Sequence, residues 1–281
     1  MRRDHLGIHL FVWGAGWAEP GFDLPRVLEA CRGLGFAGVE VPWLTPVPSA
    51  AVQAAARAAA AAGLWVTVST ALPPAACLVD RARAGAAVDW LARAAEAAAA
   101  FRSPVLCGPL LSPVGELPDG PARPWAEAAD GLGRAAEAAA RQGVLLCVEP
   151  LNRYETDVLN SLADGADLCR GLGGRIALLA DTYHQQIEEA DPVAALRAHL
   201  SQVGHVHLSE NHRGPVGTGH IPWSEVVGAL DTGGYAGRAV VEGFNGRVAA
   251  LARATCIWRP RAASPDDYAA ASAAALRPFF R

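Results

Sequence analysis

Short apolar runs rich in β-branched residues alternate along the whole chain with longer segments of helical periodicity. This alternation is typical of βα units, in which parallel strands pair with one another and the helices pack outside them. The runs that predict strands are residues 6–13, 37–41, 64–69, 104–107, 144–149, 176–181, 203–209 and 238–242. The segments that predict helices are residues 23–34, 49–62, 79–101, 125–142, 161–171, 192–200, 222–230 and 266–280.

The number of these units favours a closed barrel. Eight strands alternating with eight helices in 281 residues predict an α/β protein, a (β/α)8 TIM barrel that forms a single domain over residues 1–281. A doubly wound open sheet is the alternative, but no G-x-G-x-x-G motif follows the first strand. No linker divides the chain, and the proline-rich segment 109–124 is expected to be a long loop after the fourth strand.

Charge and hydropathy exclude several classes of protein. The net charge is −4 and no basic cluster stands out, so no nucleic-acid partner is expected. No stretch has 18 uninterrupted apolar residues, so no membrane association is expected. Residues 1–20 loosely resemble a signal peptide, but polar residues interrupt them and they fit a first strand better. The six cysteines lack a C-x-x-C pattern, which predicts free thiols and a cytoplasmic location.

Acidic and imidazole side chains stand at the ends of four consecutive predicted strands. The carboxyl ends of barrel strands meet at one face, where the active sites of such barrels form. Alternation along the seventh strand sends His205 and His207 to the same side, and we favour His207 as the one nearer the open end. The predicted metal ligands are therefore Glu149, Asp181, His207 and Glu242. This set suits one divalent ion, with Mn²⁺ expected and Mg²⁺ or Co²⁺ as alternatives.

Each of these residues alone has a simpler interpretation. A glutamate at a strand end is usually solvated, a lone histidine in an apolar strand is usually a hydrogen-bonded core residue, and Asp181 could cap the next helix. Their coincidence on consecutive strands favours a shared metal site. A further carboxylate, Glu40, ends the second strand, and no role is assigned to it.

Several segments carry a resemblance to a known family. They are "EPLNRYET" at 149–156, "DTYHQQIEE" at 181–189, "HVHLSENHRGPVGTGHIPW" at 205–223, "VEGFN" at 241–245, "GIHLFVWGAGW" at 7–17 and "GLGFAGVEV" at 33–41. They resemble the ketose 3-epimerases related to D-tagatose 3-epimerase, within the xylose isomerase-like TIM barrel superfamily of sugar isomerases and epimerases. The likeness covers nearly the whole chain and is strongest over residues 144–245.

The resemblance implies an isomerase of carbohydrate metabolism that epimerises a free ketose at C3 through a cis-enediolate. The ketose would be of the D-tagatose, D-fructose, D-psicose or ribulose type. The resemblance implies that Glu149 and Glu242 also form the acid/base pair, since proton removal on one face and return on the other need two bases. It places Glu155, His184 and Arg213 around the substrate oxygens. The expected assembly is a homodimer or a homotetramer.

Three other functions compete with this interpretation. An aldose–ketose or hydroxypyruvate-type sugar isomerase on the same barrel would use the same enediolate chemistry one carbon away. A DNA-repair endonuclease would have more histidine and carboxylate ligands and a basic surface, which the net charge disfavours. A non-catalytic sugar-binding relative would have lost one of the paired glutamates, yet both are present.

Aromatic rings at or after the first two predicted strands have two interpretations. They either pack against a sugar at the barrel mouth or belong to the core. The rings are Phe11, Trp13, Trp17 and Trp43.

Overall fold

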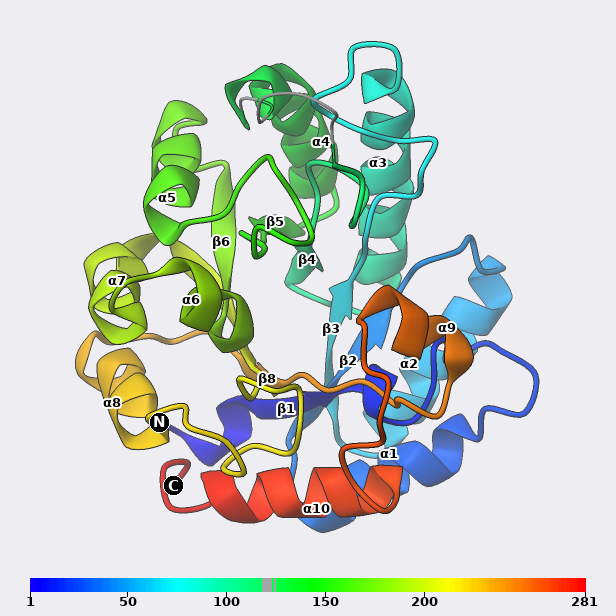
Figure 1. Ribbon diagram of the computed structural model, residues 1–281. Helices are drawn as coiled ribbons and strands as arrows, with labels where there is room; N and C mark the ends of the chain where they lie inside the picture. The colour runs from blue at the N-terminus through cyan, green and yellow to red at the C-terminus, as the bar shows by residue number, and fades with distance from the viewer. Residues whose placement is uncertain (118–122, 124) are drawn as a thin grey trace.

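The computed structural model describes residues 1–117, 123 and 125–281, and over these residues the strands form a closed parallel barrel (Figure 1). The strands follow one another around the barrel in sequence order, and the eighth pairs with the first. The predicted (β/α)8 TIM barrel is therefore confirmed. The strands are β1 (Leu6–His9), β2 (Gly38–Pro42), β3 (Trp65–Ser69), β4 (Val105–Gly108), β5 (Leu145–Val148), β6 (Ile176–Asp181), β7 (Val203–Leu208) and β8 (Ala239–Val241).

Helices fill the connections and surround the strands (Figure 1). Two short helices were not predicted: α6 (Thr182–Glu188), which begins where β6 ends, and α9 (Ala249–Ala254), which follows β8. Each spans no more than two turns, which is too short for a periodic pattern to be recognised. The helices that match predicted segments are α1 (Leu24–Leu34), α2 (Ser49–Ala61), α3 (Ala84–Ala100), α4 (Ala129–Arg141), α5 (Leu162–Gly171), α7 (Pro192–His199), α8 (Trp223–Thr232) and α10 (Pro265–Leu276).

The first strand is shorter than predicted. It ends at His9, because a 3₁₀ turn over Leu10–Val12 replaces the expected extended backbone. The Nδ1 atom of His9 accepts a hydrogen bond from the Phe11 N–H at 3.0 Å and so caps this turn. In the loop expected over 109–124, the described residues form no helix or strand. Residues 118–122 and 124 of that loop lie outside the described residues.

The N-terminal end of the barrel interior is closed by one indole ring. Strand register places Gly7 and Gly38 beside Trp65, and the ring lies across both glycines, where any Cβ would overlap it. The Trp65 N–H donates to the carbonyl of Asp4 at 2.8 Å, and the guanidinium of Arg238 stacks 4.3 Å from the ring centroid. The two glycines therefore make room for the ring that closes the barrel floor.

Side chains fill the space above this ring. A small apolar cluster that includes Val105, Cys107, Cys147 and Leu179 occupies the interior. The much larger apolar core lies between the outer face of the barrel and the helices. All six cysteines are free thiols, as predicted, and five of them are buried. In the described part of the chain, no helix has the length and apolar character needed to cross a membrane.

Candidate active site

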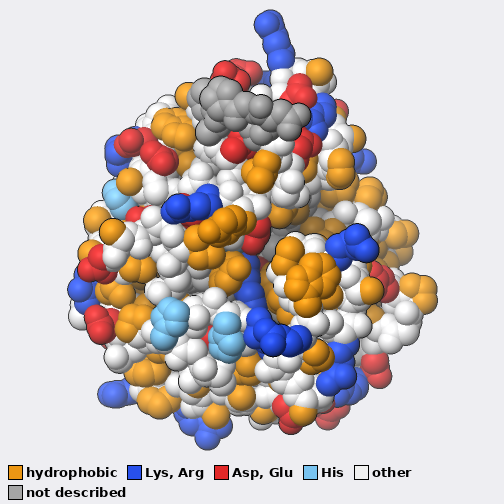
Figure 2. Space-filling view, in the orientation of Figure 1, with side chains coloured by type: hydrophobic (Ala, Val, Ile, Leu, Met, Phe, Trp, Pro, Cys, Tyr) orange, Lys and Arg blue, Asp and Glu red, His pale blue; other side chains and the backbone are white. Residues whose placement is uncertain are grey.

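A cleft of about 820 Å³, including its open mouth, lies at the carboxyl ends of the strands. Figure 2 shows a hollow near the middle of this face, with charged side chains inside it and hydrophobic ones on its flanks. Part of the cleft lining consists of ionisable side chains: Glu149, Glu155, His184, His207, Arg213 and Glu242. The rest of the lining is largely apolar and includes Leu44, Ala71, Pro109, Val114, Leu251 and Ala254.

The four predicted metal ligands surround the Nδ1 atom of His207, and they form two overlapping groups: Asp181, His207 and Glu242 have ligand atoms within 4.8 Å of one another, and Glu149 does so with Asp181 and His184. The Nδ1 atom of His207 lies 3.3 Å from Glu242 Oε1, 3.6 Å from Asp181 Oδ2 and 3.9 Å from Glu149 Oε1. Adjacent ligands of an octahedral ion with bonds of about 2.1 Å stand about 3.0 Å apart, and opposite ones about 4.2 Å apart. All four side chains are buried. The spacing of Asp181, His207 and Glu242 therefore suits one divalent ion, and Glu149 Oε1 lies 3.9 Å from the same His207 nitrogen.

The unpartnered ring nitrogen of His207 supports this fit. Its Nδ1 atom is buried and has no hydrogen-bond partner among the described residues. Its Nε2 atom lies 2.6 Å from Glu40 Oε1, so the ring donates on that side. In the neutral ring the lone pair on Nδ1 is then directed at three carboxylates, an arrangement that a bound cation would satisfy. His205 lies one layer lower and does not reach these carboxylates.

The two glutamates of the cluster have strongly altered acidity. Burial raises the pKa of Glu149 well above its usual value, and repulsion from Glu242 and Asp181 raises it further. Burial likewise raises the pKa of Glu242 to about 7, and repulsion from Asp181 adds to this. Both effects disfavour the ionised forms. A cation placed among these groups would reverse that preference.

Arg213 lies inside the same cluster. Its guanidinium donates to Glu242 Oε2 at 2.7 Å and lies 3.5 Å from Asp181 Oδ2. The rings of Tyr183 and Phe244 lie 3.8 Å and 5.0 Å from its central carbon. This fixed cation is therefore available to an anionic oxygen in the cleft.

His184 and Glu155 complete the predicted set. The Nδ1 atom of His184 accepts from the Asn152 N–H at 3.0 Å, so in the neutral ring Nε2 carries the proton. Nε2 lies 3.7 Å from Glu149 Oε1 and 3.3 Å from Arg213 Nη2, a nitrogen that cannot accept that proton. Burial lowers the pKa of His184 to about 4 and keeps the ring neutral. Glu155 accepts from the side-chain amide of Asn152 at 2.8 Å. Asn152 thus holds both residues, a role that the sequence interpretation missed.

A second missed residue, Glu210, secures the loop that carries Arg213. Arg213 has a φ of 59°, in the left-handed region, and its N–H donates to the Glu210 carbonyl at 2.8 Å. The Glu210 carboxylate accepts from the N–H of Gly217 at 2.8 Å, from the N–H of Ile221 at 3.3 Å and from the indole of Trp223 at 3.0 Å. A buried carboxylate with this many donors restrains a strained loop.

The aromatic residues divide between the two interpretations. Phe11 lines the cleft and stacks on Phe244 with ring centroids 5.3 Å apart. Trp17 donates to the Pro42 carbonyl and Trp43 packs against Trp90, so both belong to the core, and Trp13 packs against the same core.

The comparisons with known proteins agree with this geometry. Residues 28–279 match the family described as "Xylose isomerase-like TIM barrel". The chain belongs to this family. An L-ribulose 3-epimerase from Mesorhizobium japonicum is 34% identical over 260 residues, which cover 90% of this chain and 86% of the relative. A ketose 3-epimerase from Arthrobacter globiformis is 31% identical over 278 residues, covering 97% and 95%.

This xylose isomerase-like barrel also resembles solved structures of ketose 3-epimerases. A structure of L-ribulose 3-epimerase superposes with a TM-score of 0.89 at 32% identity, covering 98% of this chain and 93% of the other. A D-allulose 3-epimerase from Methylomonas sp. in complex with D-allulose superposes with a TM-score of 0.90 at 26% identity, covering 100% and 98%. The predicted kinship with ketose 3-epimerases is confirmed, and the protein is an isomerase-class enzyme.

Proposed function

We propose that this enzyme epimerises a free ketose at C3 with one divalent metal ion and two glutamates that act on opposite faces of the sugar. The observation that carries the proposal is the convergence of Glu149, just after β5, and Glu242, just after β8, on the same nitrogen of His207. These strands are not neighbours in the barrel, so the two carboxylates approach the cleft from different sides. The names of the relatives support the reaction type.

The residues that would hold the ion are Glu149, Asp181, His207 and Glu242. Three carboxylates and one imidazole suit Mn²⁺, with Mg²⁺ or Co²⁺ as alternatives. When bound, the ion supplies Lewis-acid polarisation of the ketose carbonyl, which acidifies the neighbouring C–H.

The chain's own residues would then perform the proton transfers. One of Glu149 and Glu242 removes the proton from C3, and the electron pair of that bond moves into a cis-enediolate. The other glutamate returns a proton to C3 on the opposite face. The N–H of His184 and the guanidinium of Arg213 stabilise the developing oxygen charge. Glu155 orients a substrate hydroxyl.

The substrate class follows from the charges in the cleft. Among the described lining residues, Arg213 is the single arginine or lysine, and it already contacts Glu242. Among the lining residues that the structure describes, no second lysine or arginine is available to pair with a phosphate group. We therefore propose an unphosphorylated ketose, of the ribulose, psicose, tagatose or fructose type. An aldose–ketose isomerase of the same barrel remains the rival, and the identity of the product separates the two.

The decisive experiment uses Glu149→Gln and Glu242→Gln, which keep the side-chain shape and one coordinating oxygen but remove the base. Each variant is expected to lose epimerisation while it still exchanges the C3 proton of one epimer with deuterium from the solvent. The exchanged epimer should differ between the variants, because the surviving base differs.

Metal content is measured for both variants, and Glu137→Gln on the exposed surface of α4 serves as the matched control. Loss of the ion alone would stop exchange with both epimers. Exchange of the same epimer by both metal-loaded variants would refute the two-base mechanism and favour the isomerase. The homodimer or homotetramer and the cytoplasmic location stay predictions, which size-exclusion chromatography with light scattering and cell fractionation would test.

A further inference from the structure

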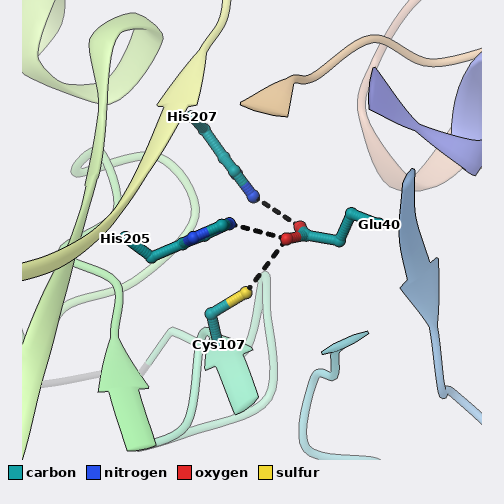
Figure 3. Close-up of side chains that lie close together, drawn as sticks. All are labelled: Glu40, Cys107, His205 and His207. Atoms are coloured by element: carbon teal, nitrogen blue, oxygen red, sulfur yellow. Dashed lines mark hydrogen bonds and ion pairs between the residues drawn. The ribbon is translucent and has the colours of Figure 1, made fainter. Parts of the chain in front are cut away.

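A second cluster of polar side chains lies inside the barrel and shares His207 with the candidate metal centre (Figure 3). Glu40 projects into it from β2, and its side chain is fully buried. Its two oxygens lie 2.6 Å from different imidazoles, Oε1 from His207 and Oε2 from His205. Oε2 also accepts from the Thr67 hydroxyl at 2.8 Å and lies 3.5 Å from the Cys107 thiol.

These contacts determine which nitrogen of His207 carries a proton. An ionised carboxylate can only accept hydrogen bonds, so the Nε2 atom that faces Glu40 must be the donor. In the neutral ring, which metal binding requires, the other nitrogen, Nδ1, then keeps its lone pair, and it is the atom that faces the three carboxylates above. If the ring carried its proton on Nδ1 instead, Nε2 and Glu40 would repel each other across 2.6 Å.

We propose that Glu40 is a positioning residue that fixes the tautomer and the orientation of His207 and so presents Nδ1 to the metal ion. The inference rests on the proposed metal dependence, and it assigns a role to a residue outside the four-ligand set. Carboxylates that accept from a metal-bound imidazole commonly change metal affinity by about 10–100-fold when they are removed.

The same cluster could instead be a second metal site, because Glu40, Cys107, His205 and His207 lie close together. The distances argue against this. Two ligands of one ion with bonds of about 2.1 Å stand about 3.0 Å or more apart, whereas both imidazole nitrogens lie 2.6 Å from the Glu40 oxygens. That spacing is a hydrogen bond.

The test measures Mn²⁺ affinity and stoichiometry, with the free ion followed by electron paramagnetic resonance. Glu40→Leu removes both acceptors and should weaken Mn²⁺ binding by about 10–100-fold. Glu40→Gln can still offer a carbonyl oxygen to His207, and it should recover most of that loss. Thr67→Val is the matched control, because it deletes a hydrogen bond to the same carboxylate without touching His207. Its affinity should stay within about threefold of the parent enzyme.

A purely structural role for Glu40 would lower the melting temperature and leave the Mn²⁺ affinity of the folded protein unchanged, which would overturn the inference. An equal loss of affinity in Thr67→Val would overturn it too. So would a second ion in the parent enzyme that disappears in Glu40→Leu. If the parent enzyme binds no divalent ion at all, the proposed metal dependence itself fails. This outcome differs from the three above, in which the parent enzyme binds Mn²⁺ and only the role of Glu40 fails.

A second measurement is independent of the Leu variant, should that variant not fold. Nitrogen NMR of histidine-labelled, Mg²⁺-loaded protein reports which ring nitrogen of His207 bears hydrogen. We expect hydrogen on Nε2 in the parent enzyme and in Glu40→Gln. Hydrogen on Nδ1 in the parent enzyme would refute the role given to Glu40.

Discussion

Gly38→Ala is expected to destabilise the fold by about 3 kcal/mol, because the added methyl group meets the ring that closes the barrel floor. The new Cβ would overlap three atoms of the Trp65 indole. To reach an ordinary contact distance of about 3.5 Å, the ring would have to move by about 1.5 Å. Neither group can yield easily, since Gly38 is held in β2 between its paired neighbours.

The magnitude follows from what the ring would lose. Overpacking a well-filled interior costs about 1–3 kcal/mol. The hydrogen bond from the indole to the Asp4 carbonyl contributes about 1 kcal/mol. Stacking with Arg238 contributes about 0.5–1 kcal/mol at a partly exposed site. The shifted ring keeps part of the hydrogen bond to Asp4 and part of the stacking with Arg238. The expected total cost is therefore about 3 kcal/mol. At about 2–4 °C per kcal/mol for a chain of this size, the melting temperature should fall by about 6–12 °C.

Circular dichroism during heating and a urea titration would measure the change. Gly228→Ala in α8 is the matched control, because its Cβ meets no atom within 4 Å and the substitution favours the helix by about 0.5–1 kcal/mol. The double variant with Trp65→Phe should recover part of the loss, since the smaller ring makes room. A melting temperature for Gly38→Ala that equals or exceeds that of the parent enzyme would refute the reasoning.

Chelation should abolish turnover, and added Mn²⁺ should restore it; full activity of thoroughly metal-free protein, checked by elemental analysis, would contradict the four-ligand site. Arg213→Ala should raise KM by about 10-fold or more while bound Mn²⁺ is retained, because a charge-assisted hydrogen bond of about 1.5–3 kcal/mol is lost. Arg153→Ala, which removes an exposed ion pair with Glu188, is the control. Glu210→Gln should lower kcat/KM and cost about 1–3 kcal/mol of stability, since an amide has one acceptor oxygen for donors that now use two; an unchanged kcat/KM would show that the loop needs no such anchor.

The barrel could be predicted because its strands are continuous apolar runs whose length and spacing differ from those of the helices. The β6 strand has the predicted bounds, residues 176–181, since it is buried along its whole length. The β1 strand does not, because the His9 side chain bonds to the backbone two residues later and ends the extended run. A local hydrogen bond of this kind does not change the pattern of apolar residues, so the end of the strand could not be recognised from the sequence.

The ligand set could be predicted for a related reason: consecutive parallel strands bring their ends to one rim. Glu40 could be seen in the sequence, but its role could not. That role depends on the layer at which its carboxylate stands, level with His9 and Thr67 on the neighbouring strands. It also depends on His205, which is 165 residues away along the chain and reaches it across the barrel. Alternation along a strand, which the sequence shows, gives the side that a residue faces. The register between strands, which the sequence does not show, gives the position of that residue along the barrel axis.

The closed end of the barrel also determines how a substrate enters and a product leaves. The Trp65 ring lies across Gly7 and Gly38 at one end of the barrel, and buried side chains pack the described interior above it. A sugar must therefore enter and leave by the same opening, and the converted sugar has to depart before the next one arrives. The two epimers therefore compete for the same cleft. Each one should act as a competitive inhibitor of the other's conversion, and progress curves should bend early as product accumulates.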